Sequence, residues 1–195
     1  MPRVSRQEAD QHRQDVIEAA SRLFREHGVD GVSVPAVMAE AGLTHGGFYG
    51  HFSSKEALAA EACLRAFDGK RGDYDAILAR NGRDTDAART EFIKRYTGKN
   101  HRDALGVGCP AAALCGDVAR DKSKGLVRAA FAAGMEMMAE KIPALLSRRK
   151  KAVGRQEALA TIAMLVGGLV LARSTRGHAI SDEILQSVRS ALLDD

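Results

Sequence analysis

The amino-acid sequence predicts an all-α fold. Of its 195 residues, 45% are hydrophobic but only 5% are aromatic, whereas β-sandwiches favour aromatic and β-branched residues. Only four prolines occur, so most of the chain runs without a residue that would break a helix. In these stretches apolar residues recur at the spacing of one helix face. A chain of this length can bury a sizeable core in one or two small domains.

The first predicted helix spans residues 10–27 and follows a polar arm at residues 1–9. Val16, Ala20, Leu23 and Phe24 form one apolar stripe along this helix. Gly28 is expected to end it, because glycine readily adopts the conformation that follows a helix.

Residues 33–56 predict a short helix, a tight turn, a second short helix and the start of a third. Ser33 is placed to cap the first short helix, and Pro35 is tolerated in its first turn. Gly42 follows the end of that helix, where a positive φ is common. The spacing is that of a helix-turn-helix, in which a turn of three or four residues joins two crossed helices.

The second short helix is expected at residues 45–51, with Thr44 as its N-cap. Three glycines in this stretch each cost about 1 kcal/mol relative to alanine. A helix that only packs has no reason to carry them, but glycine lets a backbone approach a ligand closely. In a helix-turn-helix the second helix enters the DNA major groove, so this stretch is the predicted DNA-contacting surface. The competing interpretation is a glycine loop around buried Phe48 and Phe52.

Ser53 and Glu56 predict an S-x-x-E capping box at the start of the next helix. That helix leads into a second domain, so the expected domains are residues 1–53 and 54–195. The predicted helices of the second domain cover residues 54–70, 87–101, 110–119, 124–149, 155–176 and 182–193. Breaks at residues 81–86 and 106–110 separate the first three of these helices.

The segment AGLTHGGFYGHFSSKEAL at residues 41–58 resembles the recognition-helix region of TetR-type bacterial transcriptional regulators. VIEAASRLFREHGVDGVS at residues 16–33 is similar to the first helix and loop of that family. The resemblance implies a three-helix DNA-binding head and a helical-bundle body for effector binding and dimerisation. It also implies a homodimeric repressor, released from a near-palindromic double-stranded DNA operator by a small organic or electrophilic effector.

The resemblance also implies roles for residues in the head. The candidates for phosphate contacts are Ser33, Thr44, Tyr49, His51 and Lys55, and those that face base edges are His45, Gly46 and Gly47; Tyr49 suits either role. The sequence departs from the family pattern at three positions. Lysine is frequent where His45 stands, a polar residue where Gly47 stands, and tyrosine where Gly50 stands, so the base preference stays open.

The distribution of charge does not by itself indicate DNA binding. The chain carries a net charge of +4, but residues 1–60 contain six basic and eight acidic side chains. The prediction therefore depends on local geometry, and we expect few neutralised phosphates and a modest dependence of affinity on salt. Arg3 and Arg6 are interpreted as part of a solvated tail, with contacts to phosphate or a minor groove as the alternative.

The candidate effector or sensor residues lie in the second domain. Pro110 suits the first position of a helix, which puts Cys109 at its N-cap. The helix dipole favours the thiolate there, so oxidation or alkylation of Cys109 is an alternative trigger. GVGCPAAAL is also similar to the central segment of TetR-type regulators that respond through a cysteine. The apolar residues expected to line an effector pocket, or equally to form plain core, are Phe92, Tyr96, Leu114, Phe131, Met135 and Met138.

The helix at residues 155–176 is apolar around most of its circumference and needs cover on more than one side. Its charge-free part, residues 158–172, falls short of a membrane span of roughly 18–20 residues, so we interpret it as a buried helix. A second copy packing the last two helices into a four-helix interface would cover it, and TetR-like proteins dimerise through their final helices. The candidate interface residues are Leu159, Ile162, Val166, Leu169, Val170, Ile184 and Val188.

Other function classes find little support in the sequence. It contains no H-E-x-x-H, Walker, G-x-S-x-G or Rossmann glycine pattern, so no catalytic residue, metal ligand or cofactor is predicted. The three cysteines lack zinc spacing, and without a visible secretory signal a reducing cytoplasm is the expected compartment. A Cys109–His101 or Cys109–His178 nucleophile is the enzymatic alternative. A helical interaction protein without DNA binding is the alternative in a third class.

Overall fold

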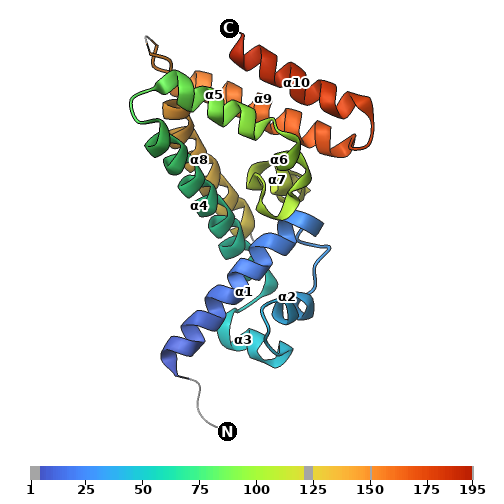
Figure 1. Cartoon of the computed structure of the whole chain (residues 1–195). Coiled ribbons are helices and arrows are strands. Elements are labelled where there is room, and N and C mark those ends of the chain that lie inside the picture. Colours follow the sequence, from blue (N-terminus) through green and yellow to red (C-terminus); the bar gives the residue numbers. More distant parts are fainter. Residues whose placement is uncertain (1–4, 121–124, 150, 195) are drawn as a thin grey trace.

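The computed structural model of the chain describes residues 5–120, 125–149 and 151–194. These residues form α-helices and short 3-10 turns, which confirms the all-α prediction (Figure 1). Arg3 of the predicted arm and Lys124 at a predicted helix start lie outside the described residues. In chain order the elements are α1 (Arg6–His27), α2 (Val34–Glu40), η1 (His45–Gly47), α3 (Phe48–His51), α4 (Lys55–Asn81), α5 (Thr85–Tyr96), α6 (Lys99–Asp103), η2 (Leu105–Val107), α7 (Pro110–Arg120), α8 (Leu126–Leu146), α9 (Arg155–Ser174) and α10 (Ala179–Leu193).

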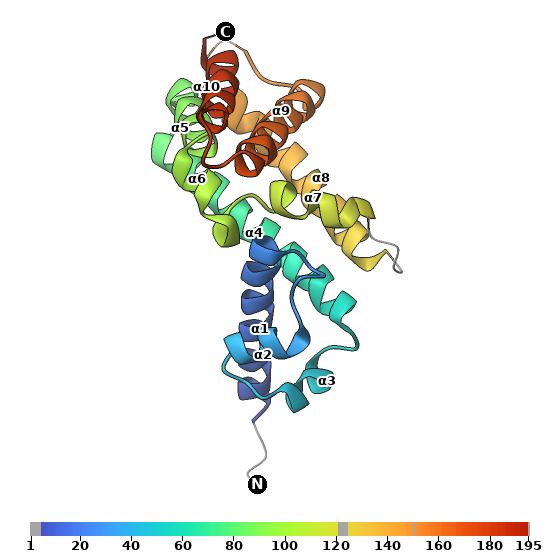
Figure 2. The ribbon, with the colours of Figure 1, turned by 90° about the vertical axis from the view of Figure 1, so that its right-hand side faces the viewer.

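The molecule has a small head at its N-terminal end and a larger helical body at its C-terminal end (Figures 1 and 2). α1, α2 and α3 form the head. α4 runs from the head into the body, where it lies beside α8, and α9 and α10 pair near the C-terminus. Contacts of α1 with η2 and α7 provide a second connection between head and body. The boundary expected between residues 53 and 54 falls just before α4.

α1 begins at Arg6, earlier than the predicted residue 10, because Ser5 is a complete N-cap. The Ser5 hydroxyl accepts the N–H of Glu8 at 3.2 Å, and the Glu8 carboxylate accepts the N–H of Ser5 at 2.8 Å. This reciprocal pair is a capping box. The second half of the predicted arm therefore belongs to the helix.

α4 is capped by Ser54, so the predicted capping box of Ser53 and Glu56 is wrong. The Ser54 hydroxyl accepts the N–H of Ala57 at 3.0 Å. The Glu56 carboxylate instead accepts the N–H of Leu126 at the start of α8, at 3.2 Å. The Glu56 side chain, which the predicted capping box would have used, thus bonds to a residue far along the chain.

α4 also runs to Asn81, past its predicted end at residue 70. Its second half faces the core, where Tyr74 and Ile77 are buried. Its first half is tied to α1 by the ion pair of Arg13 with Glu61 at 2.6 Å. The same helix therefore packs against the head and against the body.

The helix predicted at residues 87–101 is two helices. α5 begins at Thr85 because the Asp84 carboxylate caps it. After residue 96 the Thr97 hydroxyl donates to the Ile93 carbonyl at 2.7 Å, and Gly98 precedes α6. The chain therefore turns between α5 and α6, and α6 can form a wall of the body.

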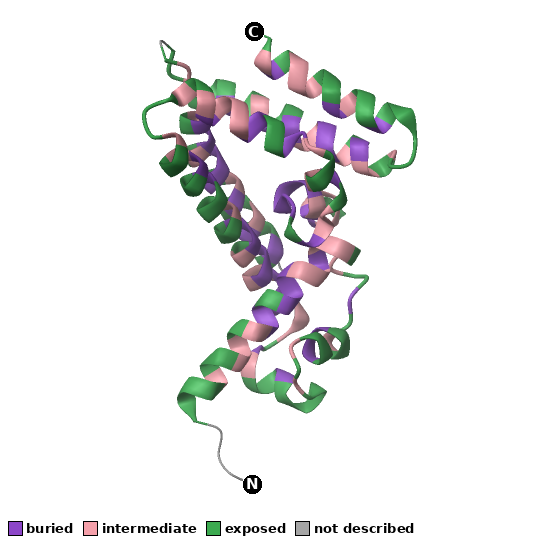
Figure 3. Ribbon diagram, viewed as in Figure 1, coloured by how far each residue is buried: buried purple, intermediate pink, exposed green. Residues whose placement is uncertain are grey.

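α4 and α8 pack side by side in the body, with buried residues toward the other helices and exposed residues on the outer side of α4 (Figure 3). A Cβ at Gly134 of α8 would lie 2.1 Å from the ring of Phe67 in α4. Glycine is therefore required there for the close approach of the two helices. Met138, Ile142 and Leu145 of α8 are also fully buried.

α9 is 20 residues long, and by length and composition alone it could cross a membrane. Within its most apolar stretch of 18 residues, 33% of the residues are buried inside the protomer. It is longer than the charge-free stretch on which the sequence interpretation relied. In the body it contacts α6, α7, α8 and α10. α10 begins at Ala179, before the predicted residue 182.

Candidate functional site

The predicted DNA-contacting surface lies at one end of the molecule, on η1, α3 and the adjoining turns (Figure 1). Tyr49 is 74% exposed although it directly follows the fully buried Phe48. Of the eight predicted residues, the exposed ones are Ser33, Thr44, His45, Gly46, Gly47 and Tyr49, and the half-buried ones are His51 and Lys55. All eight are therefore accessible on the head.

Residues 45–51 form two short turns rather than one regular helix. η1 has 3-10 geometry, and α3 has only four residues. Two glycines in η1 weaken the α-helical preference, and 3-10 turns are common at helix ends. Thr44 precedes η1 as expected, but within the described chain its hydroxyl makes no capping hydrogen bond. Ser33 does cap α2, where it accepts the N–H of Ala36 at 3.3 Å.

The glycines of this surface are not explained by packing inside the protomer. A Cβ added at Gly46 or Gly50 would meet no other described atom within 4 Å, and one at Gly47 would lie 3.8 Å from the terminal methyl of Met38. Side chains would fit at all three positions. The glycines therefore make the surface smooth without making the head compact.

Aromatic packing holds this surface on the head. The rings of Phe48 and Phe52 stack with centroids 5.6 Å apart, and Tyr49 meets the edge of Phe48 at 5.1 Å. The Arg13 guanidinium of α1 lies 4.9 Å from the Phe52 centroid, within cation–π range. The buried rings of Phe48 and Phe52 thus hold this segment on the head, while the side chain of Tyr49 is exposed to solvent.

A second candidate site is a cavity of about 790 Å³ in the body, lined by residues from α4, α5, α6 and the segment before α7. Phe92, Tyr96 and Cys109, three of the predicted effector residues, line it. The remaining predicted residues do not line this cavity in the described chain but pack in or against the core: Leu114, Phe131, Met135 and Met138. Their assignment to a pocket is corrected to the alternative that the sequence left open, plain core.

His101 joins the end of α5 to the start of α7 beside this cavity. Its Nε2 accepts the N–H of Cys109 at 3.0 Å, and its Nδ1 lies 2.8 Å from the carbonyl oxygen of Tyr96. Because Nε2 accepts, the proton is on Nδ1, which donates to that carbonyl. Burial lowers the pKa of His101 to about 4, since it penalises the charged form. The imidazole is therefore neutral at pH 7 and fixed in one tautomer.

Cys109 is fully buried between two half-buried arginines. Its carbonyl accepts the N–H of Ala113, as expected of an N-cap. Arg25 of α1 donates to the carbonyl of Gly108 at 3.2 Å. A Cβ at Gly108 would lie 2.8 Å from the backbone oxygen of Ala104 and 2.4 Å from Nη2 of Arg173, so glycine lets the backbone of residue 104 and this guanidinium approach closely. Burial lowers the pKa of Arg25 and of Arg173, yet arginine stays charged.

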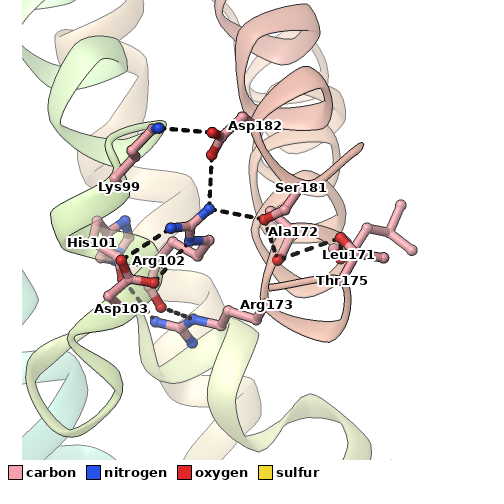
Figure 4. Close-up of polar contacts among 10 residues, drawn as sticks. All are labelled: Lys99, His101, Arg102, Asp103, Leu171, Ala172, Arg173, Thr175, Ser181 and Asp182. Carbon is pink, nitrogen blue, oxygen red and sulfur yellow. Dashed lines mark hydrogen bonds and ion pairs between the residues drawn. The ribbon is translucent and has the colours of Figure 1, made fainter. Parts of the chain in front are cut away.

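A polar cluster links the cavity wall to the last two helices (Figure 4). Arg102 of α6 donates to the Ser181 hydroxyl and the Asp182 carboxylate of α10, both at 2.9 Å. Arg173 of α9 donates to the carbonyls of Arg102 and His101, both at 3.1 Å. A change at the cavity wall can therefore reach α9 and α10 through direct contacts.

α9 and α10 leave an apolar face uncovered in the described protomer. Its side chains, which are 40–57% exposed, are Leu159, Met164 and Leu171 of α9 and Ile180 of α10. Of the predicted interface residues, Leu159 lies on this face, and Val166, Val170, Ile184 and Val188 are half-buried. Ile162 and Leu169 are buried inside the protomer, so their assignment to the interface is corrected: they face the body.

Sequence reasoning did not single out Tyr74 and Arg173, and it considered His101 only as a catalytic partner. Tyr74 lines the cavity with His101. The only local feature that could have indicated its burial is the spacing of three residues between Tyr74 and Ile77, which places both on the same face of a helix. Arg173 comes from far along the chain and carries no local signal for a contact with residues 101 and 102.

The other two cysteines and the possible metal ligands do not form a further candidate site among the described residues. Burial raises the pKa of Cys63 to about 12, while Cys115 is half-buried. Across residues 5–120, 125–149 and 151–194, no group of three or more His, Cys, Asp or Glu side chains could hold a metal ion.

Comparison with known proteins gives matches to the head and to the whole fold. Residues 16–62 match the family model described as bacterial regulatory proteins, tetR family. The HTH-type transcriptional repressor AcnR of Corynebacterium diphtheriae is 41% identical over 86 residues, which are 42% of this chain and 41% of that protein. The HTH-type transcriptional regulator AcrR of Shigella flexneri is 39% identical over 61 residues, which are 31% of this chain and 28% of that protein. The matched region is thus less than half the length of either relative.

Solved structures match nearly the whole chain. A TetR transcriptional regulator from Chloroflexus aurantiacus has a TM-score of 0.75 and 25% identity, covering 96% of this chain and 95% of that chain. The reduced form of E. coli NemR has a TM-score of 0.79 over 94% of this chain and 96% of that chain, and at 18% identity it supports the fold alone. The head thus carries the pattern of the tetR family of bacterial regulatory proteins, and the chain as a whole has the fold of a TetR transcriptional regulator.

Proposed function

We propose that the protein is a DNA-binding transcriptional repressor that acts as a cytoplasmic homodimer and is released from its operator by a small molecule. The observation that carries this proposal is the surface of residues 45–51, which is exposed, rich in glycine and anchored by Phe48. Glycines that packing does not require suit a surface that another molecule approaches closely. Tyr49, His45 and His51 supply hydrogen-bonding groups beside them.

The relatives support a regulatory role rather than an enzymatic one. AcnR is named a transcriptional repressor and AcrR a transcriptional regulator. Both matches cover only part of each chain, so we extend their role to this protein as a proposal. Two heads in one dimer would bind half-sites one helical turn apart or multiples of it, roughly 34–36 Å per turn.

The uncovered face of α9 and α10 is the proposed dimer contact. Leu159, Met164 and Leu171 lie on one helix and are each at least 40% exposed. A Cβ at Gly167, between them in sequence, would meet no described atom of the protomer within 4 Å, which leaves room for a helix of the second copy. Burial of this face would remove apolar surface from water.

The proposed release depends on contacts between the cavity wall and the head. Arg25 of α1 binds the carbonyl of Gly108, and the N–H of Val29 donates to the carboxylate of Asp117 in α7 at 3.0 Å. A ligand that binds one arrangement of these elements better than another would shift the spacing of the two heads.

Operator binding by variants of the head tests the proposal. Genomic footprinting with the purified protein would give bound fragments, and a duplex carrying the footprint would then be titrated at fixed salt. Replacing Tyr49 and His51 together by Ala should weaken binding at least about tenfold, since a lost contact costs about 1–3 kcal/mol. His178→Ala, an exposed histidine in the turn before α10, is the control. Unchanged affinity of the double variant would reject the groove model, and failure to bind any fragment would favour a helical interaction protein.

The second candidate function is a redox or electrophile switch at Cys109. Cys109 directly precedes α7, and Arg25 donates to the carbonyl of the residue before it, Gly108. Reactive cysteines are found in such electropositive surroundings. With N-ethylmaleimide, the Cys109 sulfur would add to one alkene carbon and a proton to the other, enlarging a fully buried side chain. If the reagent still releases the Cys109→Ser variant from DNA, while Cys115→Ser behaves as wild type, then Cys109 is not the trigger.

A further inference from the structure

Two tyrosines that line the cavity have buried hydroxyls without a hydrogen-bond partner among the described residues. Tyr74 and Tyr96 line the cavity and are only 4% and 6% exposed. Within the part of the chain that the structure describes, neither hydroxyl has a hydrogen-bond partner. Leaving a buried polar group unpaired costs about 1–3 kcal/mol, so each unpaired group in a native protein needs an explanation.

Both phenols remain protonated donors at neutral pH. Burial raises the pKa of Tyr74 and of Tyr96 well above the ordinary value, and the nearby Cys109 adds to both shifts. Cys109 therefore lies close to the Tyr96 hydroxyl, although the two make no hydrogen bond of normal geometry among the described residues. Each hydroxyl can donate one hydrogen bond and can also accept one, and an acceptor placed between them would take up both donated protons.

A third donor and the charge of the lining indicate a negatively charged acceptor. Arg173 lies behind the lining rather than in it: its Nη2 donates to the carbonyl of the lining residue His101 at 3.1 Å, and its Nη1 is buried and without a partner in the described ranges. The lining residues include four cationic side chains against one carboxylate, Asp73: Lys70, Lys94, Arg95 and Lys99. Lys70 pairs with that carboxylate at 2.7 Å, Lys99 with Asp182 at 2.7 Å and Arg95 with Glu91 at 3.4 Å. The lining itself therefore carries more cations than carboxylates, but three of its four cations also have a carboxylate partner.

The rest of the lining is apolar and large enough for an organic body. Ile77, Phe92 and Val107 line the same cavity, and its volume of about 790 Å³ is within the range of small-molecule sites. A carboxylate offers two acceptor oxygens and forms strong hydrogen bonds with charged donors.

We propose that this cavity binds a small organic carboxylate, with the carboxylate held by the hydroxyls of Tyr74 and Tyr96 beside Arg173 and the apolar body packed against Ile77 and Phe92. This inference rests on the proposed function, because it names the chemical class of the effector. It does not require a covalent bond to Cys109.

Calorimetric titration of the full chain without DNA tests the site. The probes are benzoate, 2-naphthoate and decanoate, each paired with its neutral primary amide. At least one carboxylate should bind once per protomer and at least about tenfold more tightly than its amide. Tyr74→Phe and Tyr96→Phe should each weaken binding of that carboxylate about tenfold to a hundredfold, whereas Tyr49→Phe and Cys115→Ser, which lie outside the cavity lining, should bind it as wild type. Because each cavity variant removes only an unpaired hydroxyl, the thermal midpoint of the free protein should stay the same or rise.

The proposal is overturned if none of the three carboxylates binds, if the amides bind equally well, or if both Phe variants keep wild-type affinity. These results are separate from the test of the proposed function. Loss of carboxylate binding with intact operator binding would remove this inference alone. Carboxylate binding that leaves operator affinity unchanged would keep the site and contradict release by this ligand class.

Discussion

The Nε2 atom of His101 accepts the backbone N–H of Cys109 at 3.0 Å. This bond fixes the start of α7 relative to the end of α5, because the other ring nitrogen donates to the Tyr96 carbonyl. It also requires a neutral imidazole, since a proton on Nε2 would face the amide proton of Cys109. The arrangement of the cavity wall is thus coupled to the protonation state of one buried side chain.

Stability should fall in acid through His101. The unfolded chain binds a proton near pH 6.5, but burial lowers the pKa of His101 to about 4 in the folded protein. The neutral His101 side chain therefore makes its full contribution to the free energy of unfolding above pH 6.5. As the pH falls to about 4, this contribution decreases by roughly 3 kcal/mol. The free energy of unfolding of wild type minus that of His101→Asn should decrease by this amount from pH 7 to pH 4. The same difference taken with His178→Asn serves as the control, and a pH-independent difference for His101 would contradict the expectation.

The contact of α4 with α8 should not tolerate a methyl group at Gly134. A Cβ there would lie 2.1 Å from the Phe67 ring, and overpacking a core costs about 1–3 kcal/mol. Gly134→Ala should therefore lower the free energy of unfolding by about that amount. Gly72→Ala, inside α4 at a position where a Cβ meets no described atom within 4 Å, should not lower it. Equal stability of the two variants would show that α8 shifts freely.

The N–H of Val29 at the end of α1 depends on Asp117 for its acceptor. Asp117→Ala should destabilise the protein by about 1–3 kcal/mol and increase amide hydrogen exchange at Val29. Asp117→Asn keeps an oxygen that can accept the N–H of Val29, so it should destabilise the protein less than Asp117→Ala. If both variants lose equally, the charge of Asp117, which also pairs with Arg120 at 3.2 Å, is the important property.

Operator binding should depend only modestly on salt, because residues 1–60 carry more acidic than basic side chains. Lys55, in the first turn of α4, is the basic candidate for a phosphate contact. Lys55→Gln should reduce the slope of log affinity against log salt by about 0.9. Lys151→Gln, at the far end of the body, should leave it unchanged. A slope that Lys55→Gln does not alter would remove Lys55 from the DNA contacts.

The local structure of the head could be predicted because turn and cap chemistry acts over a few residues. Ser33 caps α2, and Gly28 and Gly42 adopt positive φ values of 77° and 72°, as their positions predicted. The error at Ser53 shows the limit of this reasoning. Both serines fit a cap, and the choice between them involves Glu56, whose partner is the distant Leu126.

The cavity could be predicted only in part, because helical periodicity gives the inward face of a helix but not what lies opposite it. Phe92 and Met138 both face inward, yet Phe92 lines the cavity and Met138 packs in the core. Arg173 reaches the cavity wall through contacts with residues about seventy positions earlier in the chain. Such a contact follows from the packing of α9 on α6, which no local pattern encodes.

The most direct test of the central claim is the operator dissociation constant of Gly46→Ala relative to that of Gly72→Ala. At both positions a Cβ would meet no described atom within 4 Å, and replacing glycine by alanine in a helix stabilises it by up to about 1 kcal/mol. Both variants should therefore fold at least as stably as the wild type. If residues 45–51 approach DNA closely, Gly46→Ala should bind the operator at least about tenfold more weakly, while Gly72→Ala binds as wild type. Equal affinities for the two variants would contradict the account.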